Sequence, residues 1–339
     1  MNTTTPPGSA DDTERAGFLT GIWAAVPTPL LEDGELDLPG IAHNARRLRE
    51  DLGLQGIFCN GLMGEQWSLT LAERMQILEA SIEATNGRLQ IGVVASAPTL
   101  SDTLHLARHA ARVGAHHIVL MRPAGLLHER EIKSFIGTVA DSCSIPIVLF
   151  DGGELTGSFP ATLIEDLARD DVIQGVKSTR GDDSAEALRQ ECGRSVAVMD
   201  PYESHWLNNL LRFDLRVLYA DPEPYLFQLP GQRLISDYFH AYAQNDLGQA
   251  AHLFRTLEPL RTLYHRWIMG PLQQGHPINA VLKRWYSVMG FAAGPVRAPL
   301  ASLSNDEASR FDLELHAAFR QVHGIDFTFP SKDARIWKS

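Results

Sequence analysis

The sequence contains little cysteine, little lysine and no long apolar run. Its three cysteines are scattered along 339 residues without a Cys-x-x-Cys spacing, so we expect no disulfide framework and a reducing, cytoplasmic setting. No apolar run approaches the roughly 20 residues of a membrane-spanning helix. The net charge is −11, which argues against a nucleic-acid-binding surface. Residues 1–17 lack the basic start and apolar core of a signal peptide, and we expect a disordered tail there.

Several motifs of hydrolases and nucleotide-binding proteins are also missing. The chain has no G-x-S-x-G and no G-x-x-x-x-G-K-[ST] sequence, and His128-Glu129 lacks the second histidine of an H-E-x-x-H helix. We therefore expect no serine-hydrolase, P-loop or zinc-hydrolase chemistry, no metal and no cofactor.

What is present is an alternation of short apolar runs with longer amphipathic stretches. The runs that resemble strands are 21–29, 54–61, 89–97, 116–123, 145–152, 172–179, 195–201 and 215–221. They are apolar on both faces, as in a parallel sheet covered by helices. Eight such units predict a (β/α)8 TIM barrel, and the first strand is not followed by the Gly-rich turn of an open dinucleotide-binding sheet.

The expected organisation has four parts. The disordered tail covers 1–17, the barrel covers 18–247, helices packed on the barrel cover 248–325, and a second tail covers 326–339. Helix starts carry capping residues such as Thr70 with Glu73, and Ser101 with Asp102. His116 and His117 open the fourth strand, at the end of a barrel that serves stability, where we expect them to be solvated or capping.

One lysine stands out. Only Lys133, Lys177, Lys283, Lys332 and Lys338 are lysines among 30 basic residues, and of these only Lys177 lies in an apolar strand-like run, VIQGVKST. Function in such barrels lies at the carboxyl ends of the strands, where Lys177 falls. Burial favours the neutral form of a lysine amine, which can attack a carbonyl group. The alternative is a structural ion pair with Asp151 or Asp200.

Motifs in a fixed order carry a resemblance to a known family. They are VPTP at the first strand, NGLMGEQWSLTLAER after the second, GAHHIVLMRP at the fourth, IPIVLF at the fifth, GVKST at the sixth and PINAVLKRWYSVMGFAAGPVRAPLASLS near the end. Together they resemble the dihydrodipicolinate synthase / N-acetylneuraminate lyase family over residues 20–320. The resemblance implies a class I aldolase or lyase, a lysine Schiff base with pyruvate or another 2-oxo acid, and a homo-oligomer, either tetramer or dimer.

The resemblance also implies roles for individual residues. Lys177 would form the Schiff base, and Thr28 would line the base of the pocket. The backbone N–H groups of the loop Gly61–Glu65 would receive the substrate carboxylate. The wider set that we expect to bind substrate is Thr28, Gly61, Leu62, Met63, Gly64, Phe150, Glu154, Thr179 and Asp221.

The chain departs from the family pattern at three places. Leu62 and Met63 replace hydroxyl residues of the carboxylate loop, Phe150 stands where the family has a catalytic tyrosine, and Arg122–Gly125 replace a Pro-Tyr-Tyr-like segment. Phe150 cannot transfer a proton. The apolar trio of Leu62, Met63 and Phe150 suits a substrate with an apolar or aromatic portion.

A missing tyrosine requires another proton carrier. We expect at least one of Tyr219, Asp151, Glu154 and Asp221 to serve, or a water or a group on the substrate. Two other functions remain open: a non-catalytic paralogue that binds a small carboxylate, and a dehydratase or deaminase that uses the same lysine.

Overall fold

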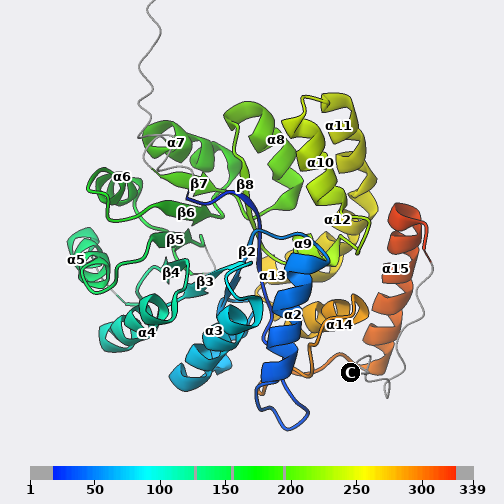
Figure 1. The fold of residues 1–339 in the computed structure, drawn as a ribbon, viewed down its shortest axis with the longest axis horizontal. Coiled ribbons are helices and arrows are strands. Elements are labelled where there is room, and N and C mark those ends of the chain that lie inside the picture. Colours follow the sequence, from blue (N-terminus) through cyan, green and yellow to red (C-terminus); the bar gives the residue numbers. More distant parts are fainter. Residues whose placement is uncertain (1–17, 126–127, 154–155, 194–195, 326–339) are drawn as a thin grey trace, which may run out of the picture. The chain divides into compact units, whose positions relative to one another are not determined.

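The computed structural model describes residues 18–125, 128–153, 156–193 and 196–325 (Figure 1). The two predicted tails, 1–17 and 326–339, and the candidate residue Glu154 lie outside the described residues.

Eight parallel strands form the central sheet, one from each apolar run of the sequence. They are β1 (Gly21–Ala25), β2 (Gly56–Cys59), β3 (Gln90–Val94), β4 (His117–Met121), β5 (Ile147–Asp151), β6 (Gly175–Ser178), β7 (Ala197–Met199) and β8 (Val217–Ala220). Their order in the sheet is β7-β6-β5-β4-β3-β2-β1-β8. Neighbours in the sheet are thus neighbours in sequence, with β1 beside β8, as a (β/α)8 barrel requires.

A helical segment follows each strand (Figure 1). These are α2 (Leu38–Glu50), α3 (Leu71–Thr85), α4 (Leu100–Val113), α5 (Glu129–Ala140), α6 (Ala161–Arg169), α7 (Asp182–Cys192), α8 (Glu203–Phe213), and after β8 both α9 (Glu223–Leu226) and α10 (Leu234–Ala243). The remaining helical segments are η1 (Gln66–Ser68), α11 (Leu247–Thr256), α12 (Glu258–Tyr264), η2 (His265–Met269), α13 (Gly270–Gln273), α14 (Asn279–Val288) and α15 (Asn305–His323). The predicted (β/α)8 barrel with C-terminal helices is confirmed.

Capping residues set where two of these helices begin. Thr70 and Glu73 form the predicted capping box at the start of α3. The prediction of Ser101 as a cap is wrong, because Thr99 accepts the hydrogen bond from the Asp102 N–H and α4 begins earlier.

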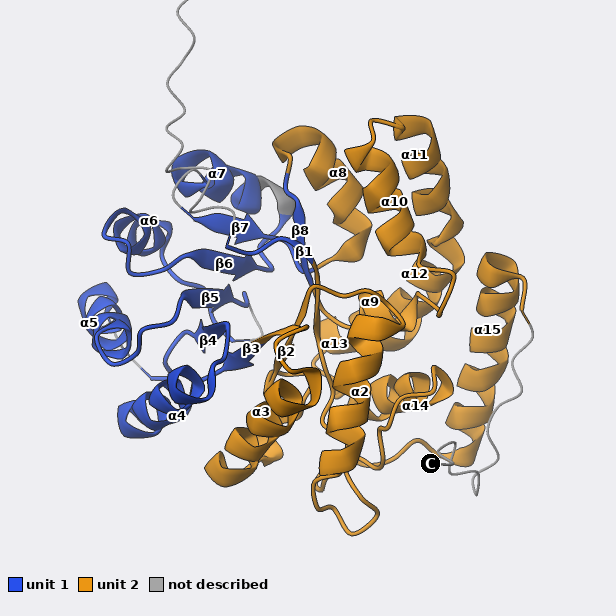
Figure 2. Cartoon of the chain, viewed as in Figure 1, with its two compact units in different colours: residues 1–21, 92–201, 215–219 blue, residues 22–91, 202–214, 220–339 orange. Residues whose placement is uncertain are grey.

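The chain divides into two compact units, each built from separate pieces of sequence (Figure 2). Unit 1 comprises residues 1–21, 92–201 and 215–219, and unit 2 comprises 22–91, 202–214 and 220–339. In unit 1, every residue of β4 and β5 is buried, which explains why these strands are apolar on both faces. In unit 2, Tyr225 and Tyr286 pack with ring centroids 4.8 Å apart.

Candidate active site

Lys177 is a buried lysine at the carboxyl end of β6, in unit 1. Its exposed fraction is 3%. The strand register pairs it with Phe150 of β5 on one side and Met199 of β7 on the other. Paired residues of parallel strands share a face, and Nζ of Lys177 lies 5.0 Å from the centre of the Phe150 ring. The amine therefore faces an aromatic ring at the position where the resemblance implies a tyrosine.

Asp151 holds the end of β5 to the segments that follow β5 and β6. Its carboxylate is fully buried. Oδ1 accepts from the Phe159 N–H at 3.0 Å, and Oδ2 accepts from the Ser178 hydroxyl at 3.1 Å. Arg180 closes the arrangement, donating from Nε to Asp151 and from a terminal nitrogen to the Phe159 carbonyl. Asp151, predicted as a catalytic group, thus has three donors, and Arg180 is a residue that the sequence reasoning missed.

Tyr219 lies within β8, and its hydroxyl is bound to a histidine. The oxygen is 2.5 Å from His117 Nε2, and both side chains are fully buried. His117 opens β4, whereas the β4 residue in register with Phe150, and through it with Lys177, is Met121 at the other end of that strand. The hydroxyl of Tyr219, one of the expected proton carriers, is thus bound to the residue that opens β4.

His117 itself differs from expectation, since it is neither solvated nor a cap. Gly92, its partner in register on β3, leaves room for the ring, because a Cβ there would lie 2.4 Å from Nε2. His116 Nδ1 lies 3.1 Å from His117 Nδ1. Burial, with a smaller contribution from the charge of His116, holds the pKa of His117 well below its usual range.

Thr28 and the loop Gly61–Glu65 belong to unit 2, where they contact each other. The Thr28 hydroxyl donates to the Gly64 carbonyl at 2.7 Å. A Cβ on Gly64 would lie 3.2 Å from that hydroxyl oxygen and from the Val26 carbonyl, so the close approach favours glycine. Thr28 is therefore a support of the loop in this unit.

The loop is a tight turn that is closed by hydrogen bonds within its own backbone. The N–H groups of Gly64 and Glu65 donate to the carbonyls of Gly61 and Leu62, at 3.0 and 3.2 Å. Within the described ranges, no acceptor is recorded for the N–H groups of Leu62 and Met63. These two N–H groups remain to bind an anion, as does that of Gly61, which also donates to no described residue.

Two further residues of unit 2 fix this loop, and the sequence reasoning missed both. Asn279, at the start of α14, donates to the carbonyls of Leu62 and Met63 at 3.2 and 3.4 Å. Lys283, one turn further along α14, forms an ion pair with Glu65 at 2.6 Å. The exposed fractions of Lys283 and Glu65 are 3% and 1%. Lys283 is thus a second buried lysine, although it lies on a helix and not in an apolar strand-like run.

Glu65 has a strained backbone as well as a buried charge. Its φ of 57° lies in the left-handed region that a residue with a Cβ rarely adopts. Its second carboxylate oxygen accepts from the Arg297 N–H at 3.0 Å. Burial lowers the pKa of Lys283, and the carboxylate of Glu65 opposes that shift. The ion pair of Lys283 and Glu65 therefore anchors the turn, in which the backbone of Glu65 is left-handed.

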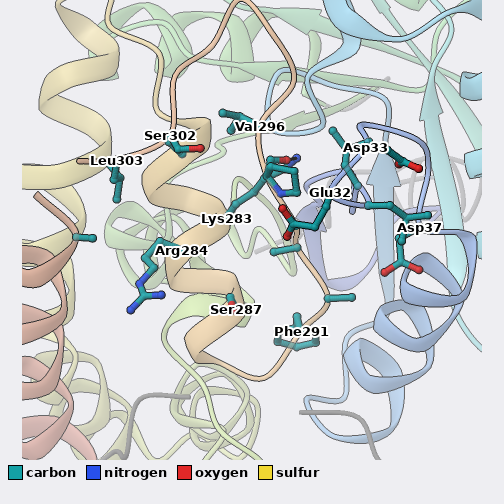
Figure 3. A pocket seen from close by; sticks show the side chains of 18 of the residues that line it. Glu32, Asp33, Asp37, Lys283, Arg284, Ser287, Phe291, Val296, Ser302 and Leu303 are labelled. Carbon is teal, nitrogen blue, oxygen red and sulfur yellow. Dashed lines mark hydrogen bonds between the residues drawn. The ribbon is translucent and has the colours of Figure 1, made fainter. Parts of the chain in front are cut away.

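Lys283 also lines a large cavity of unit 2, with a volume of about 1000 Å³ (Figure 3). Figure 3 shows it on α14, with Glu32, Asp33 and Asp37 nearby on the segment that follows β1. Asp37 is already used, because its carboxylate caps α2 through the Gly40 N–H at 2.9 Å. The Lys283 amine donates to the Pro295 carbonyl at 2.7 Å in addition to its ion pair. The cavity thus borders the loop anchor.

The other predicted site residues fall in either unit. Thr179, in unit 1, donates from its N–H and its hydroxyl to the Asp151 carbonyl, at 3.0 and 3.3 Å. Unit 1 thus brings together Lys177, Phe150, Asp151 and Thr179. Asp221, in unit 2, follows β8 directly and precedes Glu223.

Among the described residues, no group of three or more histidines, cysteines, aspartates and glutamates could hold a metal ion. No helix in the same part of the chain is long and apolar enough to cross a membrane.

Comparison with known proteins assigns a family. The model of the dihydrodipicolinate synthetase family matches residues 18–212, more than half of the chain. The chain belongs to this family. It is 26% identical to mouse N-acetylneuraminate lyase over 88% of its own length and 92% of that relative. It is 28% identical to a 4-hydroxy-tetrahydrodipicolinate synthase of Acidothermus cellulolyticus, with the same coverage. The family predicted from the motifs is thus confirmed, and the member is a divergent one.

Solved structures of this family share the fold. A putative dihydrodipicolinate synthetase from Pseudomonas aeruginosa superposes with a TM-score of 0.76 at 23% identity, covering 88% of this chain and 99% of that one. An Escherichia coli K12 prophage protein of the same family, solved in complex with pyruvate, gives 0.75 at 23% identity. This agreement supports the (β/α)8 assignment.

Proposed function

We propose that this protein is a lysine Schiff-base lyase, an aldolase or hydratase-aldolase, that acts on a 2-oxo acid such as pyruvate or a pyruvate adduct. The observation that carries the proposal is the position of Lys177 in a member of this family. It is a buried amine at the carboxyl end of a barrel strand, with the Phe150 ring 5.0 Å from its nitrogen.

The chemistry requires the amine of Lys177 and a group that moves protons. The neutral Lys177 nitrogen attacks the C2 carbonyl of the 2-oxo acid, and the carbinolamine loses water to give a protonated imine. This cation draws electrons from the C3–C4 bond while the proton carrier removes the proton of the hydroxyl group on C4. The bond breaks to leave an enamine on the lysine and an aldehyde or ketone, formed at C4, as the other product. Protonation of the enamine at C3 and addition of water then release pyruvate and the free amine.

We assign the substrate carboxylate to the loop Gly61–Glu65. The support is the family resemblance together with the unfilled N–H groups of Leu62 and Met63. Two neutral N–H groups bind an anion without a net basic protein. The side chains of Leu62, Met63 and Phe150 replace hydroxyl groups with apolar surface, which favours a substrate with an apolar or aromatic portion.

The proton carrier is a separate question, because Phe150 has no hydroxyl. The Asp151 carboxylate has three donors and the Tyr219 hydroxyl is bound to His117. We therefore assign these two residues to holding the strands and the segments after them. Asp221 and Glu154 remain our candidates for moving the proton, together with a water or a group on the substrate.

The absence of a hydroxyl at Phe150 favours one second candidate, a paralogue that binds a small carboxylate without turning it over. Reductive trapping separates the two functions. With pyruvate and borohydride, we expect one covalent adduct of pyruvate on the peptide that contains GVKST, and none in Lys177→Ala.

The control for this experiment lies in the chain itself. Lys283 is the other lysine that the structure describes as buried, and it is committed to Glu65, so the same digest should leave the Lys283 peptide unlabelled. Labelling of Lys283 or of the exposed Lys133 to the same extent would indicate non-specific reduction. No adduct at Lys177 with any of a panel of 2-oxo acids would favour the binding paralogue.

A further inference from the structure

A second cavity in unit 2 has features of a built binding site. Its volume is about 410 Å³, which suits a small molecule. It is lined by residues that include Glu203 at the start of α8, Glu223 at the start of α9, and Tyr264 at the end of α12. The first two residues follow β7 and β8 directly, on the side of a (β/α)8 barrel where ligands bind.

Two residues that line the cavity each carry a buried polar atom without a partner. Glu223 has an exposed fraction of 3% and Tyr264 of 5%. Neither Oε2 of Glu223 nor the hydroxyl of Tyr264 has a hydrogen-bond partner among the described residues. A buried polar atom left unpaired costs about 1 to 3 kcal/mol, so such atoms in a cavity indicate that something else completes them.

The other buried acid of the cavity is already neutralised. Glu203 receives Arg261 through both oxygens, at 2.8 and 2.9 Å, and the Tyr238 hydroxyl at 2.9 Å. The remaining terminal nitrogen of Arg261 donates to the Phe254 carbonyl, at 2.7 Å, and to the exposed Glu258. This network offers a ligand neither a free cation nor a free anion.

The group that remains unpaired by a cation in the cavity lining is therefore the acid Glu223. Burial, together with the negative charges of Asp221 and Glu203, raises the pKa of Glu223 well above its usual range. A ligand that brings a positive charge to the free oxygen would reverse that shift, whereas an anion would increase it. The rings of Phe227 and Tyr264, 5.8 Å apart and nearly perpendicular, add surface that also favours a cation.

We infer that this cavity binds a small molecule that carries a primary ammonium group, with Glu223 and Tyr264 as the acceptors of its N–H groups. The ammonium group donates to Oε2 of Glu223 and to the hydroxyl oxygen of Tyr264. An ammonium ion is preferred to a guanidinium ion because two separate acceptors suit three rotatable donors better than a planar fork.

Calorimetric titration of the full chain with n-butylammonium chloride at neutral pH tests this inference, with n-butanol as the uncharged probe of similar shape. We expect saturable binding of the amine and none of the alcohol. Glu223→Gln keeps the shape of the side chain and should weaken amine binding about tenfold or more. Glu83→Gln removes one carboxylate from the exposed face of α3 and should leave binding unchanged.

A second variant distinguishes a loss of amine binding from a folding defect. Tyr264→Phe removes one hydroxyl and should weaken amine binding by roughly threefold to tenfold, the effect of one hydrogen bond. Lys177→Ala should bind the amine as the parent does, so this inference and the Schiff-base proposal fail separately. Equal binding of alcohol and amine, no saturable amine binding to the parent, or unchanged binding in folded Glu223→Gln would each overturn the inference.

Discussion

At the scale of single residues, Phe150 has the most direct bearing on chemistry. Its ring lies against the amine of Lys177, at the position where the resemblance implies a tyrosine. Replacing the ring hydrogen by a hydroxyl adds a group that can donate and accept a proton without changing the shape of the ring.

We therefore expect Phe150→Tyr to accelerate Schiff-base formation with pyruvate by about tenfold or more, since a placed acid–base group contributes roughly 10²–10⁴. Rapid quenching with borohydride measures the rate. Phe150→Leu is the control for a change of packing and should give no gain. An unchanged rate in a folded Phe150→Tyr protein would show that proton transfer at this position does not limit the step.

The buried side chain of His117 makes the free energy of unfolding depend on pH. Its pKa in the folded state lies below that of the unfolded chain, about 6.5, so the unfolded state binds the extra proton. Stability is therefore retained above about pH 6.5 and falls as the pH drops below it, by about 1.4 kcal/mol per pH unit for each such histidine.

We expect His117→Gln to reduce the loss of unfolding free energy between pH 7 and pH 5 by about 2 kcal/mol. Urea titrations at the two pH values measure this difference. His105→Gln, on the exposed face of α4, should behave like the parent. An equal loss in His117→Gln and the parent would contradict the assignment of His117 as a neutral buried group.

At the scale of elements, α14 is the support of the loop after β2. Lys283→Met removes the cation and leaves the buried Glu65 without its charge partner, which should lower the free energy of unfolding by about 3 to 5 kcal/mol. Urea titration measures the change. Adding Glu65→Gln to Lys283→Met should recover part of the loss, because no buried charge then remains. If the double variant were as unstable as the sum of the single ones, the two side chains would not be coupled.

The elements also show what a sequence can and cannot predict. Lys177 was recognisable because a lysine in an apolar β-branched run is locally anomalous. Lys283 gave no such signal, because a lysine among helix-forming residues is ordinary. Its partner lies in a distant turn, as does that of Asn279, which binds Leu62 from 217 positions away. Arg180 was missed for the same reason, because its acceptors Asp151 and Phe159 lie on another part of the chain. Gly92 was missed because its role depends on the strand register with His117.

At the scale of the whole molecule, the fold followed from periodicity and motif order, which are properties of the entire chain. The oligomeric state is different, because it depends on a surface that no motif encodes. From the family resemblance we predict a homo-oligomer, either a tetramer or a dimer. Light scattering at micromolar concentration should give a mass at least twice the 37.5 kDa of one chain. A mass equal to one chain would contradict the prediction.

The anchoring of Leu62, Met63 and Glu65 by Asn279 and Lys283 has a consequence for synthesis. The ribosome makes the turn early and its supports near the end, so the nascent turn has neither its charge partner nor its amide clamp for most of translation. A premature stop before Asn279 would leave every strand present but deprive the turn of both supports. Such a truncated chain should be a good substrate for cellular proteases at this turn.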